Sequence, residues 1–227
     1  SRNVVDADGE AGLKRRLAEL EEMYKLYNGR EGRINVLASA HAEYTCSENA
    51  LREVISRAKS WGSPFYIHAS ETVAEVQGCM ERHGVSPIKW LASLGLPEST
   101  IAAHCTVVSR EDMSLMLEHN IIPVHNPVSN LKLASGIAPV PAMLKRGIIV
   151  GLGTDGTSSN NNLDLLEECR LAAMLHKGIS GDPLLIPAQE ALKLATKQGA
   201  SALGFTDVGE IEVGQKADIV LYDMQKP

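Results

Sequence analysis

Short apolar runs alternate along the chain with longer segments of helical periodicity. The strand-like runs cover residues 33–41, 64–70, 100–108, 120–127 and 147–155, and residues 2–6 resemble the end of an earlier strand. These runs are continuously apolar rather than alternating, which predicts a parallel sheet with both faces covered. A strand followed by a helix, repeated at least five times, predicts an α/β protein.

Four of the intervening segments carry helix boundary signals. Residues 10–27 repeat leucine and tyrosine along one face, and residues 45–62 begin with Thr45 and Glu48 at capping-box spacing and end on Gly62. A third helix is predicted to begin at Ser109. The last, residues 187–204, begins with a proline and ends on a glycine.

Two architectures fit this order of elements, an open doubly wound sheet and a (β/α)₈ barrel. A doubly wound nucleotide-binding fold should carry a glycine-rich phosphate turn after an early strand, and neither G-x-G-x-x-G nor a P-loop occurs. The glycine cluster at 151–156 comes late and contains Asp155, which would repel phosphate. The barrel is therefore favoured, with an active site at the carboxyl ends of its strands.

The composition of the chain limits the classes of partner that it is expected to bind. The 227 residues are 44% hydrophobic and 22% charged, and the net charge of −6 includes no basic run, which argues against nucleic acid or anionic membrane and favours a small-molecule ligand. The four cysteines form no C-x-x-C pair, so neither a disulfide framework nor a thiolate zinc site is indicated. With no apolar run near 20 residues and no signal peptide, a cytoplasmic location is expected.

The ends of the predicted strands are rich in metal-binding side chains. They are His41, His68, His104, His125 and Asp155. If the strands are parallel, these side chains gather at one end of the barrel, and imidazoles with one carboxylate suit zinc or a similar divalent metal. The other histidines, at positions 83, 119 and 176, lie in or at the ends of helices and are interpreted as surface or cap residues.

Four motifs carry a family resemblance. They are IHASET at 67–72, AAHC at 102–105, HNPVSNLKLASGIAP at 125–139 and GLGTDGTSSNN at 151–161. Together they resemble the amidohydrolase superfamily, in particular its branch of chlorohydrolases and nucleoside-type deaminases, such as S-adenosylhomocysteine and 5′-methylthioadenosine deaminases. The resemblance implies a TIM-type barrel in residues 1–205, and the ending GEIEVGQKADIVLYD resembles the return into a small β-sandwich, assigned to residues 206–227.

The resemblance also implies roles for individual residues. His68 and Asp155 match ligands of one divalent metal, zinc in the first place and iron as the alternative. Glu71 matches the acid that protonates a ring nitrogen of the substrate, and His104 matches the histidine that orients the attacking water, with Asp155 accepting its proton. The implied reaction is hydrolytic deamination of an adenine nucleoside, releasing ammonia and an inosine-type product.

Further positions match the substrate side of the site. His41 resembles a substrate-contacting histidine, and Arg2 is a candidate contact for the ribose or the tail of a nucleoside. Asn126, Asn130 and Lys132 belong to a loop typical of the family, where they contact the site or only shape the loop. A homo-oligomer is also expected.

One departure from the family pattern is important. The first barrel strand of the family carries an H-x-H pair of metal ligands, and no H-x-H occurs in these 227 residues. Counting back from Asp155 as the end of the eighth strand, residues 2–6 end the third, so we expect the later part of a longer enzyme, inactive by itself. Two alternatives stay open: a related enzyme acting on guanine, a cytosine-type ring or an s-triazine, and a metal-free barrel that serves as a binding module.

Overall fold

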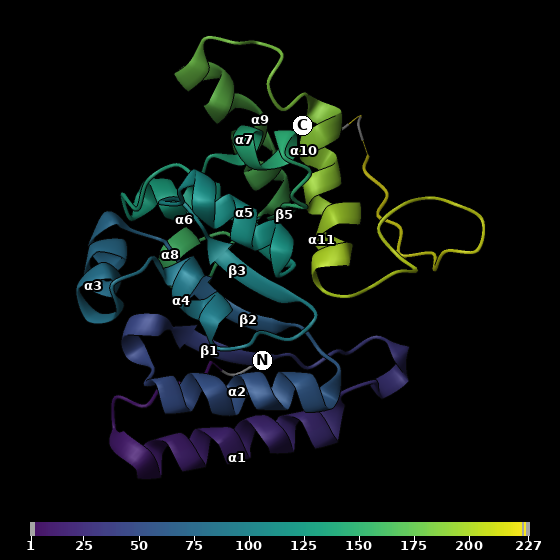
Figure 1. Ribbon diagram of the computed structural model, residues 1–227. Helices are drawn as coiled ribbons and strands as arrows, with labels where there is room; N and C mark the ends of the chain where they lie inside the picture. Colours follow the sequence, from purple (N-terminus) through teal and green to yellow (C-terminus); the bar gives the residue numbers. More distant parts are fainter. Residues whose placement is uncertain (1–2, 224, 226–227) are drawn as a thin grey trace.

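Five parallel strands form the centre of the molecule (Figure 1). The computed structural model describes residues 3–223 and 225. The strands are β1 (Ala38–Ala42), β2 (Phe65–Ala69), β3 (Thr100–His104), β4 (Ile121–His125) and β5 (Gly151–Leu152). The helices are α1 (Gly9–Tyr27), η1 (Arg30–Gly32), η2 (Glu43–Thr45), α2 (Glu48–Trp61), α3 (Val73–His83), α4 (Pro87–Ser93), α5 (Arg110–Glu118), α6 (Pro127–Lys132), α7 (Val140–Lys145), α8 (Thr157–Asn160), α9 (Leu165–Ser180), α10 (Ala188–Ala195) and α11 (Lys197–Ala202).

The order of the strands supports the barrel. Each strand pairs in parallel with the next one in sequence, from β1 to β5, without the reversal that a doubly wound sheet has at its switch point. On the outer side of β1, Val4 forms a parallel bridge with Ala40, where the earlier strand was predicted. The predicted α/β fold with a partial barrel is confirmed, although all five strands are shorter than the apolar runs that predicted them.

Helices cover the outer face of the sheet. Helix α2 packs against β1, and α1 lies alongside α2 on the side away from β1 (Figure 1). Tyr24 of α1 stacks on Trp61 of α2 with ring centroids 3.9 Å apart. At the opposite edge, α9, α10 and α11 pack against β5. The core between sheet and helices contains the fully buried side chains of Leu20, Leu51, Phe65, Ile88 and Leu194.

Two helix boundaries differ from the predictions. Ser47, and not Thr45, caps α2 by accepting a hydrogen bond from the Ala50 amide, because the Thr45 hydroxyl is turned toward the ring of His41. The segment 187–204 forms two helices, α10 and α11, because Thr196 has a non-helical backbone (φ −114°, ψ −94°). The predicted start at Ser109 is confirmed, with a complete capping box that includes Asp112.

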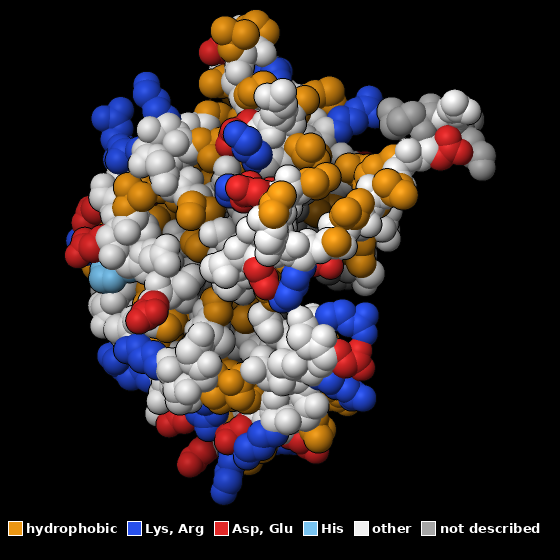
Figure 2. All heavy atoms as spheres, turned by 90° about the vertical axis from the view of Figure 1, so that its right-hand side faces the viewer, with side chains coloured by type: hydrophobic (Ala, Val, Ile, Leu, Met, Phe, Trp, Pro, Cys, Tyr) orange, Lys and Arg blue, Asp and Glu red, His pale blue; other side chains and the backbone are white. Residues whose placement is uncertain are grey.

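The C-terminal segment contains turns but no strand within residues 206–223. Its apolar side chains are exposed, including Ile211, Val213 and Leu221. Figure 2 views the side of the molecule that carries this segment and shows hydrophobic side chains gathered in the upper half of that face. The assignment of residues 206–227 to a β-sandwich stays a prediction. No helix in the described part of the chain is long and apolar enough to cross a membrane.

Candidate metal and catalytic site

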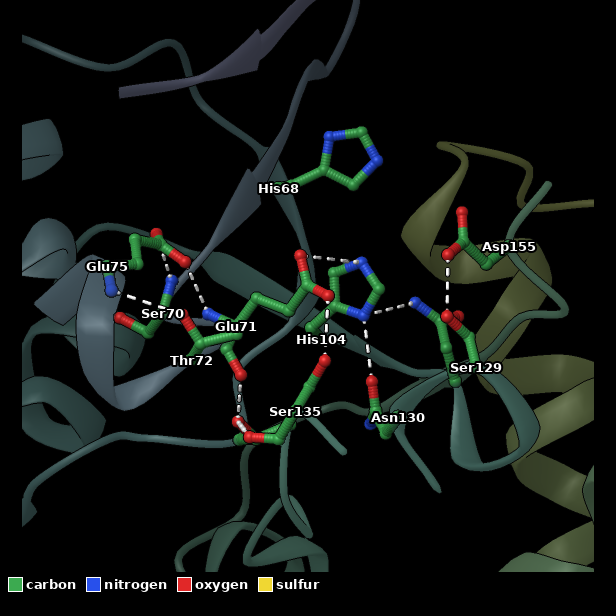
Figure 3. A network of polar contacts seen from close by, with 12 residues as sticks. His68, Ser70, Glu71, Thr72, Glu75, His104, Ser129, Asn130, Ser135 and Asp155 are labelled. Atoms are coloured by element: carbon green, nitrogen blue, oxygen red, sulfur yellow. Dashed lines mark hydrogen bonds and ion pairs between the residues drawn. The ribbon is translucent and has the colours of Figure 1, made fainter. Parts of the chain in front are cut away.

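Three of the predicted residues meet at the carboxyl ends of the strands. His68 comes from β2, His104 ends β3, and Asp155 follows β5. One potential ligand atom of each residue lies within 4.8 Å of those of the other two. Figure 3 shows the three side chains around a common centre, with Glu71 beside His104. The predicted clustering of these residues is therefore present in the fold.

His68 is held by an irregularity in β1. The register of β1 against β2 shifts between Ser39 and Ala42. The His41 carbonyl accepts a hydrogen bond of 2.6 Å from Nδ1 of His68. This bond leaves Nε2 as the free nitrogen, which is how backbone partners orient metal-binding histidines. Burial lowers the pKa of His68, so the ring is neutral at pH 7 and can donate a lone pair.

His104 is buried, and its ring is held by Asn130. Its backbone is left-handed (φ +74°), a conformation that residues other than glycine rarely adopt. Nδ1 lies 2.8 Å from Oδ1 of Asn130, which can only accept a hydrogen bond. This contact is shorter than the 3.4 Å from Nδ2 of Asn126 to the same nitrogen, so it assigns a proton to Nδ1. Nε2 points to the side of the site that holds Glu71.

The surroundings of Asp155 favour its ionised form, which suits binding of a cation. Its backbone is also left-handed (φ +62°), and its carboxylate accepts hydrogen bonds of 2.7 Å from the Ser129 hydroxyl and the Gly156 amide. Burial by itself would raise the pKa of Asp155. These two hydrogen bonds and the nearby imidazoles outweigh burial and lower the pKa, so the group is a carboxylate at neutral pH.

The glycines before Asp155 permit a close approach of two strand ends. A Cβ on Gly153 would lie 2.6 Å from Oδ1 of Asn126 and 2.8 Å from Cγ1 of Val124. Any larger residue there would push the loop that carries Asp155 away from β4. The glycine therefore positions Asp155 as well as forming a turn.

Glu71 extends over the ring of His104. Its Oε2 lies 3.8 Å from Nε2 of His104, and its Oε1 accepts a hydrogen bond of 2.9 Å from Ser135 (Figure 3). The Thr106 hydroxyl donates to the Glu71 main-chain carbonyl. Glu71 is thus a half-buried carboxyl group adjacent to the histidines but not itself part of the group of potential ligands.

The remaining predicted residues lie at or beyond the edge of the site. The ring of His41 lies 5.0 Å from that of His68, and its Nδ1 is 2.9 Å from the Thr45 hydroxyl. Lys132 donates to the Ser158 carbonyl and to Asn161, so it ties the loop after β4 to the loop after β5. Arg2 lies outside the described residues.

Two histidine predictions are wrong. His125 does not join the cluster, because successive residues of a strand point to opposite faces. Asn126 faces His104, so His125 points outward and packs against His176 of α9, with ring centroids 5.7 Å apart. His176 is accordingly buried and is not a surface residue. His83 and His119 do lie at the ends of α3 and α5.

The sequence analysis missed two serines that hold the site. Ser129 contacts Asp155 and Ser135 contacts Glu71. Both lie inside the motif at 125–139, so the motif gave the segment but not these contacts. Asn130, which the sequence left open as a contact or a loop residue, contacts His104. Tyr66 lies two residues before His68 on the same face of β2, with ring centroids 5.6 Å apart, and strand alternation would have indicated it.

The donor set fits a divalent transition metal. Two imidazoles whose Nδ1 atoms are engaged by protein partners and one carboxylate of lowered pKa are the ligand types that zinc and iron accept. Each has a partner on its far side, namely the His41 carbonyl, Asn130 and Ser129. Such partners orient the ligands of metal sites. His68 and Asp155 would hold the ion, and His104 lies close to the same centre.

Known deaminases and a chlorohydrolase are similar to this chain over most of its length. The chain is 46% identical to a 5-methylthioadenosine/S-adenosylhomocysteine deaminase of Caldanaerobacter subterraneus, over 100% of the chain and 53% of the relative. The solved structure of an adenosine deaminase from Xanthomonas campestris with bound zinc has a TM-score of 0.83 at 35% identity, covering 92% of this chain and 47% of that one. An atrazine chlorohydrolase from Arthrobacter aurescens complexed with zinc has a TM-score of 0.84 at 25% identity, covering 90% and 46%.

The chain spans about half the length of the curated relatives that it matches. The model of the amidohydrolase family matches residues 6–227, which is nearly the whole sequence. The order of strands, the His68, His104 and Asp155 cluster and the neighbouring Glu71 occupy this matched region. This chain belongs to the amidohydrolase family.

Proposed function

We propose that the chain supplies most of the active site of a metal-dependent hydrolytic deaminase of adenine nucleosides, such as S-adenosylhomocysteine or 5′-methylthioadenosine. The observation that carries the proposal is the carboxyl group of Glu71 beside the His68, His104 and Asp155 cluster. The cluster suits activation of water, and Glu71 suits protonation of a ring nitrogen. The deaminases among the relatives support the same reaction.

His68, Asp155 and His104 have separate roles in activating the water. A divalent ion held by His68 and Asp155, with zinc preferred and iron as the alternative, would lower the pKa of water to about 7. Nε2 of His104 accepts a hydrogen bond from the attacking water and so fixes its direction. Asp155 is ionised at neutral pH because its pKa is lowered, and its carboxylate takes the proton on a remaining lone pair.

Glu71 acts on the other reactant. As the water adds to the carbon that bears the amino group, adenine C6, Glu71 donates a proton to the adjacent ring nitrogen, so that negative charge does not accumulate there. Return of a proton to the leaving nitrogen releases ammonia and gives an inosine-type nucleoside. His41 lies at the rim of the site, next to His68, where it can contact the substrate. Arg2 is a further proposed contact, for the ribose or the tail.

A related reaction on another ring is the second candidate. The atrazine chlorohydrolase superposes as well as the adenosine deaminase does, with TM-scores of 0.84 and 0.83. The same cluster could activate water for attack on an s-triazine, a guanine or a cytosine-type ring. Glu71 favours ring protonation but does not select the ring.

The test is ammonia release by the full-length protein that contains this chain. The substrates are adenosine, 5′-methylthioadenosine, S-adenosylhomocysteine, guanine and cytosine, and chloride release from a chlorotriazine is measured in parallel. We expect the two thio-nucleosides to give the highest kcat/KM. Turnover of the triazine alone, or of none of these compounds by metal-loaded protein, would overturn the proposal. The homo-oligomeric state and the cytoplasmic location stay predictions.

A further inference from the structure

Glu75 binds the backbone next to Glu71 in an unusual way. It is the third residue of α3, and it is buried (7% exposed). Its Oε1 accepts the Ser70 amide and its Oε2 accepts the Glu71 amide, both at 2.7 Å. One carboxylate therefore holds two consecutive N–H groups at the end of β2 (Figure 3).

Helix capping does not account for this arrangement. In a capping box the third helical residue accepts the amide of the cap residue itself, as Asp112 does with Ser109 at the start of α5. In α3, the cap residue Thr72 accepts the Glu75 amide at 3.1 Å. The Glu75 carboxylate, however, bonds the two residues before the cap. The contact is directed at the loop and not at the helix.

The loop that Glu75 holds is in a rarely populated conformation. Ser70 is fully buried and left-handed (φ +52°), which turns the chain sharply at the end of β2. This turn directs the Glu71 side chain toward His104. Without the carboxylate, two N–H groups would lose their partner in a largely buried place, and a relaxed turn would move Glu71.

Glu71 is also held at its other end. The Ser135 hydroxyl donates to its Oε1 at 2.9 Å, and the Thr106 hydroxyl contacts both the Glu71 carbonyl and, at 3.2 Å, the Ser135 carbonyl. Glu75 thus fixes the backbone of Glu71, and Ser135 fixes its carboxyl group. Neither Glu75 nor Ser135 is a member of the ligand cluster.

We propose that Glu75 and Ser135 are positioning residues that hold Glu71 in place for proton transfer. The inference rests on the proposed function of Glu71. A displacement of about 1 Å in a reacting group can lower the rate about 10²-fold. Glu75→Gln replaces one acceptor oxygen with an N–H donor, so it can hold one of the two amides but repels the other. We expect kcat to fall about 10²-fold in Glu75→Gln and about 10-fold in Ser135→Ala.

A double-mutant cycle with Glu71→Gln separates positioning from stability. The amide side chain of that variant cannot deliver a proton, so a further displacement of the side chain lowers the rate no more. In the Glu71→Gln background we expect each of the two substitutions to change kcat by less than about twofold. If each substitution lowers kcat by the same factor in both backgrounds, Glu75 and Ser135 act on the folded structure as a whole. The inference is then wrong.

The matched control is Asp112→Asn. Asp112 is a buried third helical residue whose carboxylate accepts hydrogen bonds from its own cap, Ser109, and from Ser86, far from Glu71 in the chain. The Asp112→Asn substitution should lower Tm as Glu75→Gln does but leave kcat within about twofold of the wild-type value. If Glu75→Gln does not fold, Glu75→Asp replaces it, because the shorter side chain keeps the carboxyl group but cannot reach both amides.

Hydrogen exchange tests the contact without any substrate. We expect the amides of Ser70 and Glu71, followed in a peptide spanning 65–76, to exchange at least about tenfold faster in either Glu75 variant than in the wild-type protein. Unchanged exchange would overturn the inference even if the proposed reaction is right. If Glu71→Gln is inactive while the Glu75 variants keep full activity, the proposed function stands and the positioning role is wrong.

Discussion

Acid should destabilise the protein through His125. This side chain is 1% exposed, and neither ring nitrogen has a hydrogen-bond partner among the residues that the structure describes. Burial lowers the pKa of His125 to about 3, and the neighbouring imidazoles of His176 and His104 add to the effect. We expect His125→Leu, which replaces the unpaired imidazole with an apolar side chain of similar size, to reduce the loss of stability in acid.

The sign and size of the acid effect on stability follow from the pKa values of His125 in the folded and unfolded states. The folded-state pKa of about 3 lies below the unfolded value of 6.5, so the unfolded chain binds the proton first. The contribution of the neutral ring is complete above pH 6.5 and is lost as the pH falls toward 3. At about 1.36 kcal/mol per pH unit, the loss is about 2 kcal/mol at pH 5 and approaches about 5 kcal/mol near pH 3.

The assay is urea unfolding of the full-length protein at pH 7.5, 6.0 and 5.0. The wild-type protein should lose about 2 kcal/mol more than His125→Leu between pH 7.5 and 5.0, and the variant should be no less stable at pH 7.5. His119→Leu, at the end of α5, is the control and should follow the wild-type curve. Equal acid losses in wild type and His125→Leu would refute the reasoning, because another group would then bind the proton.

Three other substitutions test the site and the core. Glu71→Gln should retain metal by elemental analysis but lose about 10²–10⁴-fold in kcat, since it cannot donate the proton; near-normal turnover would remove Glu71 from the mechanism. His68→Ala should lose metal and activity together, and full metal occupancy would contradict its assignment as a ligand. Phe65→Ala, at the start of β2 and fully buried, should cost about 3–5 kcal/mol in urea unfolding. As a control, Leu184→Ala, at a side chain that is 81% exposed, should change the free energy of unfolding by less than about 0.5 kcal/mol.

The order of elements could be predicted from the sequence because it depends on local patterns. Apolar runs and cap residues such as Ser109 reflect burial and hydrogen bonding within a few residues. The parallel order of the strands then brings His68, His104 and Asp155 to one edge. Periodicity was less informative about where each strand ends. The last strand, for example, pairs only over Gly151 and Leu152.

The errors concern side-chain direction and competing partners. A strand-end histidine can face the barrel or the helices, and a difference of one residue decides this for His125 and Asn126. Thr45 has capping spacing, but its hydroxyl lies against His41, and Ser47 takes the cap. Such choices depend on neighbours that are distant in sequence, which local patterns do not contain.

Backbone strain connects the fold to the proposed chemistry. Ser70, His104 and Asp155 are all left-handed, and each stands at the point where a strand leaves the sheet. A residue other than glycine costs of order 1–3 kcal/mol in such a conformation, so it persists only where contacts hold it. The contacts are present in each case: Glu75 holds the turn at Ser70, Asn130 holds His104, and Ser129 holds Asp155. Glycine would relieve the strain, but at His104 and Asp155 it would remove the imidazole and the carboxylate that the site needs. The partner residues therefore offset the strain of these sharp turns, which is why Glu75, Asn130 and Ser129 belong to the description of the site although none of them is a member of the ligand cluster.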